Sequence, residues 1–431
     1  MNFLKEQAIP LDKQLHTWHD IVKRPYNRDK VCNYTRTRQI LMNGIEVEAW
    51  CFKHAFVRML DDPDLKKTIC AIRRIEDLQQ TTINWLCPAN QTVLDTTLGY
   101  EQVAVDLTAW LAQNEDNKYV KETFDFGLLE DFDHLYRYSQ FINLVEETDP
   151  NDILHNQTDV LIGRPTQYHH NCNMLRVRNP YDKDKTSPKT KVNILTLVSA
   201  EQQTHNFYSE HGFMYGNTDL KRLYAEIKDV EEEHVTMYET LIDPRETWLE
   251  KWLLHEFTEA CCYYNCYLDE TDERIKLIYE EMFKMELAHL QKAAKKFEEF
   301  EKRDPESIIG DCEILPCSFK SQKEYVKKVL YKETNKRVDK EGNYNTVDAL
   351  APEWGSYVVQ KALNDKGAPS ERAIEVSIQK FGRDIALSDS AALSKQPELL
   401  EKSLENYKAP NTVGVDEYKK FSEIKPDIYL Y

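Results

Sequence analysis

The 431-residue sequence is poor in residues that interrupt helices, with only 12 glycines and 16 prolines. So few helix breakers argue against a fold of many short strands joined by tight turns, and they favour long helices. The sequence also has no apolar run near the ~20 residues that a membrane-spanning helix needs. We therefore expect an all-α protein that is not inserted in a membrane.

Other absences narrow the setting and the partners. The first residues, MNFLKEQAIPLDKQ, lack the apolar core of a signal peptide, so we expect a cytoplasmic protein. In that compartment the ten cysteines are expected to be reduced thiols. A formal net charge of -18 repels both nucleic acid and anionic lipid, so neither is an expected partner.

Two long stretches, 38–147 and 194–303, repeat apolar residues at helical spacing. Each is broken into four segments by turn and capping residues. In the second stretch, for example, Gly216-Asn217 separates the first two helices, and Asp243-Pro244 is expected to start the third. The domain prediction is an N-terminal extension (1–37), a first four-helix bundle (38–147), a connector (148–193), a second four-helix bundle (194–303) and a C-terminal extension (304–431).

Acidic residues interrupt the apolar stripes at matching positions of the two stretches. Both series advance in steps of 30, 25 and 30 residues, so one offset of 155 residues superposes them and also places His134 on His289. The first series is Glu46, Glu76, Glu101 and Asp131; the second is Glu201, Glu231, Glu256 and Glu286. A shared period of this length predicts a tandem duplication.

The second stretch carries the richer set of metal-ligating side chains. Burying several ionised carboxylates at one level of a bundle is costly unless a cation neutralises them. Carboxylate and imidazole together suit Fe or Mn, and two Glu-x-x-His pairs with glutamates from two other helices are typical of di-metal bundles. The predicted ligands are Glu201, Glu231, His234, Glu256, Glu259, Glu286 and His289.

These motifs resemble those of the ferritin-like di-metal carboxylate proteins. Glu231-Glu232-Glu233-His234 and Glu286-Leu287-Ala288-His289 supply the two Glu-x-x-His pairs, and the extra glutamate of Glu256-Phe257-Thr258-Glu259 is similar to the rubrerythrin pattern. The resemblance implies Glu231 and Glu286 as bridging ligands and the two histidines as terminal ones. It further implies a di-iron or di-manganese redox protein that reacts with peroxide or O₂ and receives electrons from an external donor.

Two alternatives stay open at this point. The centre could belong to a di-metal oxygenase that acts on a small organic substrate, or to a metal-binding or structural assembly protein without catalysis. Because a fold and a ligand set do not choose a substrate, the sequence does not decide among them.

The first stretch has a weaker version of the ligand pattern. Gln79 stands where the second stretch has His234, Ala104 stands at the position of Glu259, and the shorter Asp131 replaces Glu286. The second site there would consist of Glu46, Glu76, Gln79, Glu101, Asp131 and His134. Metal occupancy of this first bundle is left open, because the same residues could form a hydrogen-bonded polar network.

The region after residue 304 is polar and has no copy of the ligand pattern. Shorter helical patterns occur at 323–331 and 370–381. We expect this C-terminal extension to wrap the bundles or to mediate assembly, with a homo-oligomer as one outcome.

Overall fold

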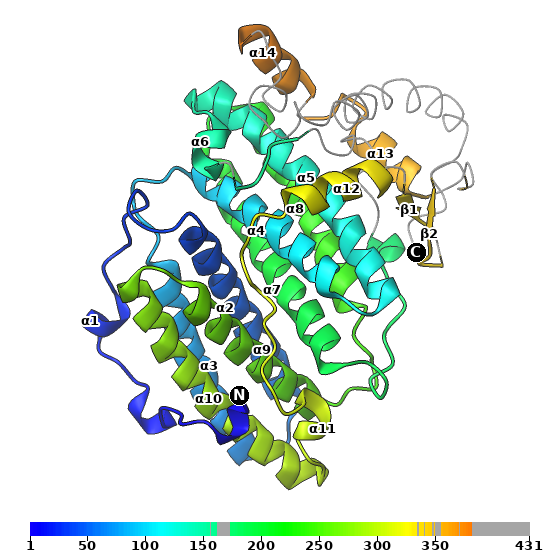
Figure 1. The fold of residues 1–431 in the computed structure, drawn as a ribbon. Coiled ribbons are helices and arrows are strands. Elements are labelled where there is room, and N and C mark those ends of the chain that lie inside the picture. Colours follow the sequence, from blue (N-terminus) through cyan, green and yellow to red (C-terminus); the bar gives the residue numbers. More distant parts are fainter. Residues whose placement is uncertain are drawn as a thin grey trace.

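The structure is a computed structural model that describes residues 1–155, 157–161, 173–333, 336–339, 341–346, 349, 355–369 and 371–381. The protein is mostly helical, as expected (Figure 1). Among the described residues the only strands are β1 (Lys336–Val338) and β2 (Tyr344–Thr346), which pair antiparallel. No helix in these ranges has the length and apolar character needed to cross a membrane.

Eight long helices form the body of the protein. They pack as four antiparallel hairpins, each made of two helices that follow one another in the chain. The hairpins are α2 (Tyr34–Met59) with α3 (Pro63–Asn84), α4 (Val93–Asn114) with α5 (Lys118–Glu146), α7 (Pro188–His211) with α8 (Thr218–Glu239), and α9 (Trp248–Asp269) with α10 (Glu273–Glu301).

The helix bounds reproduce the internal repeat. Adding 155 residues to both ends of α3 gives α8, and the same offset carries α4 onto α9 and α5 onto α10. The α2 helix begins within one residue of the position that the offset predicts from α7. The 155-residue offset found from the acidic residues therefore also relates the first and last residues of the helices.

The tandem arrangement of the bundles is not confirmed, because the hairpins pair across the two halves of the chain. The α2–α3 hairpin lies against α9–α10, through α2 and α9. The α4–α5 hairpin lies against α7–α8, through α4 with α7 and α5 with α8 (Figure 1). We call the first group bundle A and the second bundle B. Each bundle thus combines residues of 38–147 with residues of 194–303.

The two bundles join along α2 and α7, the first long helix of each half. Gly44 allows the close approach, since a Cβ there would lie 2.6 Å from the side chain of Gln203. The Gln203 amide accepts from Asn43 Nδ2 (2.8 Å) and donates to the Ile40 carbonyl (2.7 Å). Both halves have the same apolar pattern, so a hairpin of one half can pack against a hairpin of the other half. The contact between α2 and α7 joins the two bundles that result from this exchange of hairpins.

Capping residues set most helix starts at the expected breaks. Asp62, Asn117, Asn217 and Asp272 cap α3, α5, α8 and α10 through side-chain oxygens. The predicted start of α9 at Asp243-Pro244 is wrong. The helix begins at Trp248, because Thr247 and Glu250 form a reciprocal capping box, whereas Asp243 accepts from the Arg245 backbone in the preceding turn.

Shorter segments cover the outside of the bundles. They are η1 (Phe3–Lys5), η2 (Leu11–Lys13), α1 (Trp18–Ile21), α6 (Pro150–Leu154), η4 (Asn173–Leu175), η5 (Gly212–Met214), α11 (Glu306–Ile309), α12 (Lys323–Glu333), α13 (Gly355–Leu363) and α14 (Glu371–Phe381). The N-terminal segment packs on α10, and α12 and α14 pack on α5. The C-terminal extension therefore does wrap part of bundle B, through two helices near the expected positions.

Candidate metal centres

Bundle B encloses a cluster of carboxylates and histidines, which we call cluster B. Each of its four helices contributes at its middle, and all six side chains are fully buried. Potential ligand atoms of Asp131, Glu201, Glu231 and His234 lie within 4.8 Å of one another, and so do those of Glu101, His134 and Glu231. Cluster B comprises Glu101 (α4), Asp131 and His134 (α5), Glu201 (α7), and Glu231 and His234 (α8).

Glu231 lies between the two histidines of cluster B. His134 Nδ1 is 2.9 Å from one Glu231 oxygen, and His234 Nδ1 is 3.2 Å from the other. The same His234 nitrogen is 3.4 Å from Asp131 and 3.6 Å from Glu201. Glu231 belongs to both groups of potential ligands, and a carboxylate in that position could bridge two cations.

Three of the four carboxylates of cluster B lack the hydrogen-bond donors that buried anions need. Within the part of the chain that the structure describes, neither oxygen of Asp131, Glu201 or Glu231 accepts a well-formed hydrogen bond. Burial, with the nearby Glu201 carboxylate, raises the pKa of both Asp131 and Glu231 well above the ordinary values. A cation between these oxygens would remove that penalty.

Residues around cluster B orient its ligands. His234 Nε2 donates to Glu130 Oε2 (3.0 Å), which leaves Nδ1 facing the carboxylates. Arg176 holds Glu130 with two hydrogen bonds (2.8 and 2.9 Å) and also pairs with Glu233. A carboxylate behind a histidine fixes the ring and its tautomer and is a common support of metal ligands.

Tyr208 of α7 supports cluster B through Glu101 of α4. Its hydroxyl donates to a Glu101 oxygen, and the ring is buried against Tyr138 and Tyr224 at centroid distances of 5.3 and 5.6 Å. This hydrogen bond holds one oxygen of Glu101; the other accepts no hydrogen bond among the described residues and lies 3.9 Å from His134 Nδ1.

Bundle A encloses a second cluster, which we call cluster A. Potential ligand atoms of Glu76, Glu256, Glu286 and His289 lie within 4.8 Å of one another, and a second group consists of Glu46, Glu259 and Glu286. The whole cluster is Glu46 (α2), Glu76 and Gln79 (α3), Glu256 and Glu259 (α9), and Glu286 and His289 (α10), and each is at most 2% exposed.

Cluster A already contains a protein cation. The ammonium of Lys53, which is fully buried, lies 2.5 Å from Glu76, 3.0 Å from Glu256 and 3.3 Å from Glu259. Burial alone would lower the pKa of Lys53, but these glutamates raise it well above the ordinary value, so the side chain is charged. Burial also raises the pKa of Glu76, to about 8 despite Lys53.

Gln79 and His289 complete cluster A. Gln79 Nε2 donates to Glu286 Oε1 (2.7 Å). The residue of cluster B that is equivalent to Gln79 in the repeat is His234. His289 donates from Nε2 to Gln14 of the N-terminal segment (2.7 Å), and its Nδ1 is 3.1 Å from Glu286.

The predicted ligands are thus all buried at the two bundle centres, but they are grouped differently. Glu201, Glu231 and His234 meet Glu101, Asp131 and His134, which were assigned to the weaker site. Glu256, Glu259, Glu286 and His289 meet Glu46, Glu76 and Gln79. The seven residues predicted as one site within 194–303 therefore lie in two candidate clusters, because the hairpins are exchanged between the halves.

Sequence reasoning missed Lys53 and Arg176, and it considered Glu130 only as a substitute ligand of the weaker site. Lys53 lies seven residues after Glu46, two helical turns along the same face, and this spacing was a usable signal. Glu130 precedes Asp131, and Arg176 lies in the connector, where no spacing rule relates it to α8.

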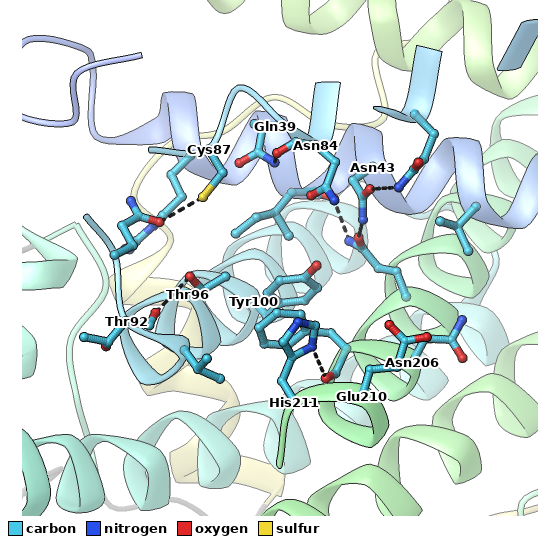
Figure 2. Close-up of a pocket in the computed structure, with 18 of the residues that line it drawn as sticks. Gln39, Asn43, Asn84, Cys87, Thr92, Thr96, Tyr100, Asn206, Glu210 and His211 are labelled. Atoms are coloured by element: carbon cyan, nitrogen blue, oxygen red, sulfur yellow. Dashed lines mark hydrogen bonds between the residues drawn. The ribbon is translucent and has the colours of Figure 1, made fainter. Parts of the chain in front are cut away.

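A cavity of about 490 Å³ lies between the bundles (Figure 2). Side chains of α2, α3, α4 and α7 line it, among them Asn43, Gln80, Tyr100 and Gln203. No ligand residue of either cluster is part of its lining. The cavity therefore does not give a bulky substrate direct contact with the carboxylates.

No protein-family model, curated protein or solved structure matches this chain.

Proposed function

We propose that cluster B binds two iron or two manganese ions and that the protein uses them for redox chemistry with peroxide or O₂. The observation that carries the proposal is the donor set: two acid-x-x-His pairs on α5 and α8, with one glutamate each from α4 and α7. That is the ligand pattern of di-metal carboxylate bundles, assembled here from both halves of the chain.

Charge supports two ions. Glu101, Asp131, Glu201 and Glu231 carry four negative charges when ionised, and two divalent cations balance them with both histidines neutral. The unpartnered oxygens of three of these residues, and the Nδ1 atoms facing them, are the atoms that would hold the ions. Bound iron or manganese would supply one-electron redox steps and Lewis acidity toward an oxygen species.

The burial of cluster B favours a small oxidant. All six ligand side chains are fully buried, and the cavity between the bundles touches none of them. Peroxide and O₂ need little space, whereas an organic substrate needs a pocket that reaches the metals. This geometry supports the peroxidase or oxidase reading over the oxygenase, with electrons from an external donor.

The test is metal analysis coupled to an oxidant assay. Wild-type protein purified without chelator is expected to hold two iron or manganese ions at cluster B, visible in an anomalous-scattering map. It should consume peroxide or O₂ with a chemical reductant. The variant His134→Ala/His234→Ala should lose both ions and the activity.

His255→Ala is the matched control. His255 is a nearly buried histidine on α9, and its ring stacks on Phe52 at 4.1 Å, outside both clusters. This variant should keep metal and activity. A metal-loaded wild-type protein that consumes neither oxidant would leave a metal-binding or structural role, and a centre without metal would end the proposal.

A further inference from the structure

Cluster A and cluster B occupy equivalent places in the repeat, yet one residue pair differs in charge. Lys53 plus 155 residues is Tyr208, and Glu256 is the counterpart of Glu101. Tyr208 donates to Glu101, and Lys53 pairs with Glu256. The same contact therefore exists in both clusters, but only in cluster A does it bring a full positive charge.

The position of Lys53 blocks one of the two ligand groups of cluster A. Its ammonium is 2.5 Å from Glu76 and 3.0 Å from Glu256, and both belong to the group that includes His289. A divalent ion bound to the same oxygens would lie beside the ammonium, and two cations at that distance repel strongly in a buried site. The histidine side of cluster A is therefore neutralised by protein.

The other ligand group stays available. Glu46, Glu259 and Glu286 offer oxygens within 4.8 Å of one another, and Lys53 pairs with only one oxygen of this group, Oε1 of Glu259 at 3.3 Å. Within the described ranges, Oε2 of Glu46, Oε2 of Glu259 and the amide oxygen of Gln79 accept no hydrogen bond. Gln79 is 1% exposed and already contacts Glu286 through its amide nitrogen, so an amide flip would present its oxygen to the same place.

We infer that cluster A binds one divalent cation through oxygen ligands only, with the Lys53 ammonium in place of a second metal ion. The proposed ligands are Glu46, Glu259, Glu286 and the amide oxygen of Gln79. Hard ions such as Mn²⁺ and Mg²⁺ prefer carboxylate and amide oxygens, so this ion belongs to that class. Cluster A is then a single-ion site that stabilises the bundle, separate from the proposed redox pair.

The test counts Mn²⁺ in protein whose cluster B is disabled. The His134→Ala/His234→Ala variant is stripped with chelator, dialysed against Mn²⁺ and analysed by elemental analysis and electron paramagnetic resonance. We expect one Mn²⁺ per chain with the signal of an isolated ion. Adding Lys53→Met should raise the count to two, with the broadened signal of interacting ions.

Two further variants in the same background act as controls. Lys191→Met removes another buried lysine, one that pairs with Glu246 far from the ligands, and should leave the count at one. Glu46→Ala removes a proposed ligand that does not contact Lys53, and should reduce the count to zero. This second variant keeps the test decisive if Lys53→Met fails to fold.

Three results would overturn the inference. A folded background variant that binds no Mn²⁺ would show that cluster A is an ion-pair network alone. A background count of two that Glu46→Ala lowers to zero would show that Lys53 does not displace an ion, and an unchanged count in folded Lys53→Met would show that Lys53 does not set the capacity. Glu46→Ala identifies the counted ion as one bound at cluster A, because an ion held by the remaining carboxylates of cluster B would not depend on Glu46.

Discussion

Clusters A and B are two answers to the same problem, the burial of several carboxylates at the centre of a four-helix bundle. Cluster B has four carboxylates and two histidines and no lysine or arginine among these residues, whereas cluster A has five carboxylates, one histidine and Lys53. A buried carboxylate without a counter-charge costs several kcal/mol, so each cluster needs positive charge. The difference teaches that a buried lysine on the same helix face as the carboxylates can supply part of the positive charge that a metal ion would otherwise provide.

The largest difference between the two bundles is expected in their loss of stability when metal is removed. Chelation should destabilise bundle B by about 4 kcal/mol if the free metal concentration was about a thousand times the dissociation constant. Bundle A should change less, because Lys53 stays in place. Hydrogen exchange followed by mass spectrometry can measure this, since peptides of α5 and α8 should lose more protection than peptides of α3 and α10.

The His134→Ala/His234→Ala variant is the control for that experiment, because its bundle B should no longer respond to chelator. Equal loss of protection in both bundles would contradict the assigned difference between the clusters.

A smaller effect is expected from the residue behind His234. Glu130→Gln keeps the size of the side chain but weakens the charge-assisted hydrogen bond to His234 Nε2, so metal affinity at cluster B should fall about 10–100-fold. Competition with a metal indicator measures the change. The matched change in bundle A is Gln14→Leu, which removes the partner of His289 and should leave the affinity of cluster B unaltered.

How far the sequence predicts this protein depends on the kind of information each feature needs. Helix bounds follow from local signals such as Asn217 and Asp272, and the 155-residue offset fixes which side chains share a level. The choice of partner hairpin is a long-range property. Because the two halves have the same stripe pattern, spacing alone allows Glu231 to face either Glu286 or Asp131, and the structure places Asp131 there.

Lys53 illustrates a second limit of sequence reasoning. A lysine in an amphipathic helix usually extends its charge to water, and the exchange of hairpins adds Glu256 of the other half to Glu76 around this one. The charge state of cluster A could not be derived before the partners of α2 were known.

The smallest predicted effect separates the two tyrosines that bond to the clusters. Tyr208 donates to Glu101 in cluster B, and Tyr263 donates to Glu46 in cluster A. Tyr208→Phe should reduce metal affinity at cluster B only, and Tyr263→Phe should reduce Mn²⁺ affinity at cluster A only, each by about 1 kcal/mol, the net contribution of one such hydrogen bond. Titration of each variant measures this. If either change weakened both clusters equally, the bundles would be linked through α2 and α7, and the clusters could not be treated as independent sites.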